Sequence, residues 1–149
     1  MKKLVQFVIF LSFLICNIDL GYAIPSKDVI NQSFMLHRAS EQLNHKEVAD
    51  YLAAGADVNS VNSEGQTPLR LAISATASND DNAHSGLEIV RSFLKQPETI
   101  VDYNVYVHAK REHERSVGKW ERSILKPEHL KWQVDDLKEI VALLGEKKP

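Results

Sequence analysis

The amino-acid sequence predicts an all-α fold, a short stack of helix pairs that repeats along the chain. The first observation is spacing: the interval from Leu36 to Leu69 is the same as that from Ala39 to Ala72. The second is that apolar residues recur at i, i+3 and i+4, as on a helix with one buried face. The third is a set of capping residues that divides the chain into short helices. The interval corresponds to a period of about 33 residues, which with two helices per unit is typical of a repeat array.

The clearest helix signals begin at Asn44, an N-cap residue that has Glu47 three positions later, as in a capping box. Gly55 is expected to end this helix, because glycine accepts the positive φ of a helix C-terminus. After a polar turn, Thr67 and Pro68 restart a helix as N-cap and first helical residue. Each start is followed by an apolar stripe: Val48, Tyr51 and Leu52 in the first helix, and Leu69, Ala72 and Ile73 in the second.

These residues resemble the ankyrin repeat family. Residues 55–59 followed by 65–72 are similar to its repeat, and Thr67-Pro68-Leu69 matches the Thr-Pro-Leu-His motif of the family. Arg70 stands where the family usually has histidine. The resemblance implies a short ankyrin-type solenoid.

The resemblance extends to both sides of this repeat and covers roughly residues 34–104. Residues 86–94 resemble the outer helix of the next repeat, and residues 36–39 resemble a degenerate first repeat. Two repeats are hardly stable alone, and about three are usually needed. We therefore expect about three repeats, the last one irregular, with boundaries near residues 34–60, 61–104 and 105–149.

The irregular C-terminal unit is predicted from a second helix pattern. Residues 136–144 align without gaps on residues 44–52, and Gly145 is expected to end that helix. A charged helix is expected around residues 106–116, and another helix from near Pro127. An alternative joins residues 127–144 into one helix, since its apolar residues keep a 4-3-4-3 spacing.

Two further segments flank the repeats. Ser26 is expected to cap a helix that carries Val29, Ile30 and Phe34 and shields the first repeat from solvent. Residues 74–85 are small and polar. They predict either an extended loop or a lengthened helix end followed by a loop.

Residues 1–23 have the pattern of a cleavable secretion signal. Two lysines precede an apolar run over residues 4–16, and the small residue Ala23 follows. This run is shorter than the stretch of about 20 residues that a membrane-spanning helix needs, so cleavage is favoured over anchoring. We expect a signal peptide at residues 1–23 and a mature chain, residues 24–149, that is periplasmic or secreted and has no stable membrane span.

Composition limits the function classes open to the mature chain. Cleavage takes Lys+Arg from 18 to 16 and Asp+Glu from 20 to 19, so the net charge changes from −2 to about −3. This small acidic excess argues against binding to nucleic acid or to an anionic membrane surface. Cys16 is also removed, so stability must come from packing apolar helix faces rather than from disulfides.

Candidate metal and catalytic residues do not form a convincing site. His108 and His113 bracket a motif similar to a zinc site, but they lie about 140° apart on a helix, with two cations between them. Residues 79–82 are rich in oxygen ligands and lack the spacing of a calcium loop. There is no nucleophile elbow and no glycine-rich phosphate loop. We therefore expect no catalysis, no metal and no cofactor.

The charged stretch over residues 110–132 is interpreted as solvated helix surface. Acidic residues alternate with basic ones there, which weakens any electrostatic attraction to nucleic acid. Trp120 and Trp132 are expected to pack the irregular end, although an exposed tryptophan would be an anchor for a partner.

The ankyrin resemblance implies protein–protein interaction through turn tips and the exposed face of the inner helices. The expected roles are those of an inhibitor, an immunity protein or an adaptor. Two alternatives remain: a structural cap or spacer in an envelope assembly, or an enzyme that uses His113, Glu112 or Asp136 in the C-terminal region. Carried over by position, the partner-binding candidates are Val61, Asn62, Ser63, Glu64, Gln66 and Arg70.

Overall fold

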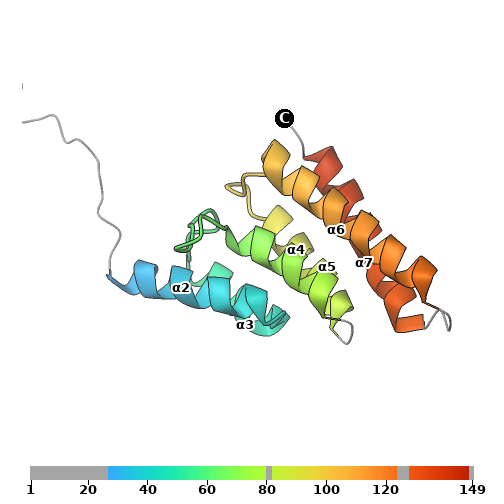
Figure 1. Cartoon of the computed structure of the whole chain (residues 1–149). Helices are drawn as coiled ribbons and strands as arrows, with labels where there is room; N and C mark the ends of the chain where they lie inside the picture. The colour runs from blue at the N-terminus through green and yellow to red at the C-terminus, as the bar shows by residue number, and fades with distance from the viewer. Residues whose placement is uncertain (1–26, 80–81, 124–127, 148–149) are drawn as a thin grey trace, which may run out of the picture.

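The computed structural model describes residues 27–79, 82–123 and 128–147 of the chain, and all regular structure within these ranges is helical (Figure 1). The predicted all-α class is therefore confirmed. The expected signal peptide and the expected cap at Ser26 lie outside the described residues. The helices are α2 (Lys27–Glu41), α3 (His45–Ala53), α4 (Pro68–Ser78), α5 (Ala83–Leu94), α6 (Tyr103–Arg122) and α7 (Glu128–Glu146).

The helices form two layers. Helix α4 contacts α2 and α6 on either side in one layer, and α5 contacts α3 and α7 in the other (Figure 1). Each helix of the first layer also packs on the helix that follows it in the chain, which gives the pairs α2–α3, α4–α5 and α6–α7. This arrangement is a short helical solenoid, in which each pair buries its apolar face against its neighbour.

Local capping explains where the first helices begin and end. The Asn44 side chain accepts the N–H of Glu47 at 3.2 Å, which starts α3. Gly55 follows that helix with a φ of +83°, a conformation that glycine adopts readily. The Thr67 side chain caps α4, whose first residue is Pro68. All of these positions agree with those predicted from the sequence.

A single apolar core runs between the two layers and through all three helix pairs. Its fully buried large side chains include Leu36 on α2, Ile73 on α4, Phe93 on α5 and Ile140 on α7. Burying one such side chain stabilises a fold by roughly 1.5–3 kcal/mol. Since α7 contributes to the same core, the C-terminal pair is part of the stack.

Helices α4 and α5 approach each other closely at Gly86. A Cβ atom at this position would lie 1.8 Å from Thr76 Oγ1, so the crossing requires glycine. The Thr76 hydroxyl donates to the carbonyl of Ala72 at 2.7 Å. The Thr76 carbonyl in turn accepts from the buried Gln133 side chain of α7 at 2.9 Å. One residue of α4 is thus in contact with both α5 and α7.

The N-terminal helix differs from the arrangement that the sequence predicted. The helix expected to carry Ile30 and Phe34 is present, but it continues through Leu36 as α2 and so belongs to the first repeat. Their side chains are 55% and 68% exposed, whereas Leu36 is fully buried. A two-residue offset turns a helix by about 200°, so Phe34 and Leu36 face opposite directions.

The loop between α4 and α5 follows one of the two alternatives left open. Helix α4 continues to Ser78 and α5 starts at Ala83, so most of the polar stretch over residues 74–85 extends the helices. Hydrogen bonds from Ser78 Oγ to the carbonyl of Ser74 and from the Asn79 N–H to the carbonyl of Ala75 hold the lengthened helix end.

The C-terminal helices are longer than predicted. Helix α6 begins at Tyr103 because Asp102 caps it, accepting the N–H of Val105 at 2.7 Å. Helix α7 is continuous, as in the joined-helix alternative, and passes through Gly145, so the predicted end at this glycine is wrong. None of the helices in the described ranges combines the length and the apolar character that a bilayer span requires.

The two tryptophans differ in their burial. Trp120 on α6 is half-buried, in keeping with the expected packing of the C-terminal pair. Trp132 on α7 is 62% exposed, so the expectation that it packs there is wrong. It stands next to the buried Gln133, and its own side chain faces away from the core because adjacent helical positions differ by about 100°.

Candidate protein-binding groove

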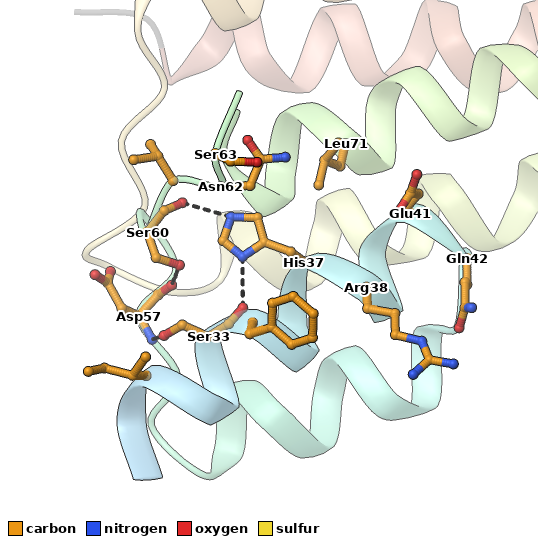
Figure 2. A pocket seen from close by; sticks show the side chains of 13 residues that line it. Ser33, His37, Arg38, Glu41, Gln42, Asp57, Ser60, Asn62, Ser63 and Leu71 are labelled. Atoms are coloured by element: carbon orange, nitrogen blue, oxygen red, sulfur yellow. Dashed lines mark hydrogen bonds between the residues drawn. The ribbon is translucent and has the colours of Figure 1, made fainter. Parts of the chain in front are cut away.

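An open groove lies between α2, α4 and the first loop, which we define as residues 54–67 between α3 and α4. Its volume is about 810 Å³. One wall is α2, the other consists of residues of the first loop between positions 57 and 63, and Leu71 of α4 also lines the groove (Figure 2). We call it the first groove.

His37 holds the first loop against α2. The imidazole is buried, and its Nε2–H donates to the carbonyl oxygens of Ser60 at 3.1 Å and Gln66 at 3.2 Å. Its Nδ1 lies 2.7 Å from the carbonyl oxygen of Ser33. The Ser33 hydroxyl accepts the N–H of Asp57 at 3.2 Å, as Figure 2 shows. These contacts make the loop a fixed wall of the first groove.

Asn62 closes the tip of the first loop. Its side-chain oxygen accepts the N–H of Glu64 at 3.0 Å and of Gln66 at 2.9 Å. Its backbone N–H donates to the Gln66 carbonyl at 3.0 Å. Gly65, between these residues, has a φ of +72°, which favours glycine. Asn62 and Gln66 therefore shape the turn.

Three exposed apolar side chains line the first groove. Ile30 and Phe34 project from α2, and Val61 projects from the first loop with 62% of its surface exposed. Large apolar side chains gathered at a concave surface are characteristic of sites that bind other molecules. The first groove therefore has the chemical character of a binding surface.

The predicted partner-binding residues of the first loop have different environments. Val61, Ser63 and Glu64 are exposed, and the first two line the first groove. Asn62 also lines it, but its polar atoms are engaged in the turn. The Gln66 carboxamide oxygen lies 3.5 Å from Asn62 Nδ2, so Gln66 faces the loop.

Arg70, the last predicted residue, is on the other side of α4. It lines a second, smaller groove of about 320 Å³ between α4 and the start of α6. His108 and Arg111 of α6 also line this second groove. Arg70 therefore does not line the first groove.

Sequence reasoning missed Ile30, Phe34 and Leu71 as groove residues. The signal was present in the helical period, because Ile30 and Phe34 are four residues apart and fall on one face. Leu36 and Ala39 are out of phase with that face, and they are buried. Had residues 27–41 been interpreted as one helix, two opposite apolar faces would have been predicted.

Two of the residues considered for catalysis, Glu112 and Asp136, have separate partners. Glu112 is buried and accepts two hydrogen bonds from Arg115, at 2.9 and 2.8 Å. Asp136 lies 3.9 Å from His84 Nδ1, and burial raises its pKa above the ordinary value while His84 opposes this shift. In the described ranges, no group of three or more His, Cys, Asp or Glu side chains has the arrangement of a metal site.

Part of the chain is similar to known repeat proteins. Residues 36–79 match the family described as ankyrin repeats (many copies). A 60-residue alignment, which covers 36% of this chain, is 45% identical to transient receptor potential cation channel subfamily A member 1 of Homo sapiens. The chain covers 5% of the length of that channel. No solved structure matches the chain.

The helix pairs, the capped Thr67-Pro68 helix start and the match over residues 36–79 show that this chain contains ankyrin repeats. Its fold is an ankyrin-type helical solenoid. Ankyrin repeats are interaction modules, so the class of ligand that they imply is another protein. This class is consistent with the exposed apolar residues of the first groove.

Proposed function

We propose that this chain is an exported, non-catalytic binding protein that holds a protein partner in the first groove. The observation that carries the proposal is the trio of exposed apolar side chains, Ile30, Phe34 and Val61, around a groove of about 810 Å³. The partner role is that of an inhibitor, an immunity protein or an adaptor.

The chemistry of the first groove supports an apolar anchor. Burying an aromatic side chain such as Phe34 contributes strongly to interface energy, and such anchors concentrate near the centre of an interface. The wall opposite Phe34 is held by His37, so little ordering of the loop is required on binding. Preorganisation of this kind increases affinity by lowering the entropic cost of association.

Export is a separate part of the proposal and has its own test. The apolar run over residues 4–16 and the small residue at Ala23 support cleavage after position 23. Intact mass spectrometry of the chain recovered from its own cells should then show a protein that begins at Ile24. A recovered chain that retains residues 1–23 would contradict the cleavage.

A role as a structural cap or spacer in an envelope assembly is the second candidate. Trp132 on α7, far along the chain from the first groove and 62% exposed, is the observation that favours it. An assembly contact at α7 would bury this tryptophan. In that case the residues of the first groove would contribute little to binding of the partner.

Affinity capture tests the proposal directly. The full chain with a C-terminal tag is expressed in its own host, and retained proteins are identified by mass. We expect Phe34→Ser to lose the partner and Trp132→Ser, which removes a similarly exposed aromatic side chain, to keep it. Loss of the partner only in Trp132→Ser would move the interface to α7 and overturn the assignment to the first groove.

A further inference from the structure

The second groove occupies a place where the repeat pattern is broken. The interval from His37 to Arg70 equals that from Leu36 to Leu69, so Arg70 has the equivalent position in the next repeat. His37 donates to loop carbonyls at Ser60 and Gln66. In the next repeat α6 begins directly after Asp102, so no counterpart of that part of the loop exists. Arg70 thus presents donors where the repeat supplies no acceptor.

One donor of the Arg70 guanidinium lacks a hydrogen-bond partner among the described residues. Its Nε atom is buried and has no hydrogen-bond partner in the described part of the chain. Neither Arg70 nor Arg111 takes part in an ion pair there. Buried donors are nearly always paired in native proteins, and leaving one unpaired is unfavourable. Because the Nε atom itself is closed to solvent, a ligand can pair only with the part of the guanidinium that lines the second groove.

The charges around the second groove leave one positive charge uncompensated. Arg70 and Arg111 contribute two guanidinium groups, and the carboxylate of Asp102 offsets one of them. Burial, and secondly the charge of Arg70, lower the pKa of His108, so this imidazole is neutral near pH 7. Its Nε2 lies 2.8 Å from the Ser74 hydroxyl. The groove is therefore suited to a ligand with a single negative charge.

We propose that the second groove binds a carboxylate of an acidic protein segment, with Arg70 as its principal ligand and Arg111 as the second. This inference rests on the proposed binding function and specifies part of the partner's chemistry. A planar carboxylate matches the fork of N–H donors on a guanidinium. A phosphate dianion carries more charge than the groove leaves uncompensated, and Asp102 would repel it more strongly.

The position of α4 suggests how one partner reaches both grooves. Leu71 of α4 lines the first groove, and its neighbour Arg70 lines the second. A segment that crosses α4 would place an apolar side chain against Phe34 and Val61 and an acidic side chain against Arg70. The partner segment therefore has an apolar residue and an acidic residue within a few positions of each other.

Fluorescence anisotropy with a labelled hexaglutamate peptide tests the inference on the full chain at low ionic strength. Hexaglutamate should bind and a matched hexaglutamine peptide should not, and added salt should weaken the complex by screening. We expect Arg70→Gln to weaken binding about tenfold or more, as loss of a charge-assisted pair does. Arg111→Gln should weaken it several-fold.

Lys110→Gln is the matched control, because Lys110 is an exposed residue of α6 that does not line the second groove. It removes the same charge and should change affinity by less than about twofold. Equal weakening by Lys110→Gln and Arg70→Gln would overturn the site, since it would indicate general attraction to positive charge. If Arg70→Gln does not fold, the comparison of Arg111→Gln with Lys110→Gln decides the question.

Nuclear magnetic resonance of the arginine Nε–Hε groups provides a second readout. Hexaglutamate should shift the Arg70 signal, and acetate at high concentration should shift it in the same direction. A shift with inorganic phosphate but none with hexaglutamate or acetate would overturn the carboxylate assignment. If Arg70 binds hexaglutamate while affinity capture yields no partner, the carboxylate site stands and the proposed function fails.

Discussion

The two junctions of the first helix layer are built differently. Between α2 and α4, His37 holds the first loop by donating to the carbonyl oxygens of Ser60 and Gln66. Between α4 and α6, the equivalent loop segment is absent and Arg70 faces an open groove. The same repeat position thus holds a loop in one unit and is available for a ligand in the next.

The second junction obtains its stability from helix packing instead. Thr76 of α4 meets Gly86 of α5 at close range, and its carbonyl accepts from Gln133 of α7. These groups are buried. The comparison therefore predicts that substitutions in the packed contact and at His37 reduce stability, whereas substitution of Arg70 mainly affects binding.

The largest decrease in the free energy of unfolding is expected for Gly86→Ala. The added Cβ would lie 1.8 Å from Thr76 Oγ1 and 2.9 Å from its Cβ, so α5 must move away from α4. Overpacking of this kind costs about 3 kcal/mol in the free energy of unfolding. Urea unfolding monitored by circular dichroism measures this loss of stability, and Gly118→Ala on α6 is the control.

Gly118 has only the flexible end of Arg122 near its open side, at 3.1 Å. Alanine has a higher helix propensity than glycine, so Gly118→Ala should be neutral or stabilising by about 0.5 kcal/mol. Equal stability of Gly86→Ala and the parent chain would contradict the close packing of the second junction.

The second largest decrease in the free energy of unfolding is expected for His37→Ala. This change removes a buried ring together with its hydrogen bonds to the first loop, which should cost about 2 kcal/mol. Arg70→Gln at the equivalent position should change the free energy of unfolding by less than about 0.5 kcal/mol. If both substitutions destabilise equally, the two junctions do not differ in the way described.

A smaller effect is expected from Gly65→Ala in the turn of the first loop. Gly65 has a φ of +72° and nothing within 4 Å of an added Cβ, so the change introduces backbone strain alone. The expected cost is about 1 kcal/mol, from the same unfolding measurement. A stabilised Gly65→Ala chain would indicate that this residue does not require a positive φ.

The smallest effect is a dependence of stability on pH that arises from the titration of His108. Burial lowers its folded-state pKa below the ordinary 6.5, so as pH falls through this region the unfolded chain takes up a proton more readily than the folded chain. Stability is therefore lost as pH falls below about 6.5, by less than about 1 kcal/mol after solvent screening. The groups that face His108 are Arg70, Arg111, Glu112 and Arg115. Substitution His108→Gln should remove this part of the pH dependence, and an unchanged profile would contradict it.

Much of the fold could be predicted from local signals. Asn44, Gly55 and Thr67 are helix-boundary residues whose effect depends on the nearby backbone, and each acts as expected. The repeat period that separates Leu36 from Leu69 indicated that both belong to one buried layer. Such features require no knowledge of distant contacts.

The candidate sites were only partly predictable, because they depend on long-range packing. Val61 and Ser63 were found by position in the repeat, but Phe34 was assigned to a shielding helix. Exposure of Phe34 depends on which face of α2 meets α3 and α4. The second groove arises from the missing loop segment before Tyr103, whose effect on Arg70 becomes visible only once α6 is placed beside α4.

Site-specific photo-crosslinking tests the central claim that the first groove holds a protein partner. A benzophenone amino acid is placed at Val61, which lines the groove, or at Ala49, an exposed residue on α3 of the same repeat. Illumination of the full chain in its own cells should give one discrete heavier species from position 61 and none from position 49. Crosslinks of equal yield from both positions, or from position 49 alone, would contradict binding through the first groove.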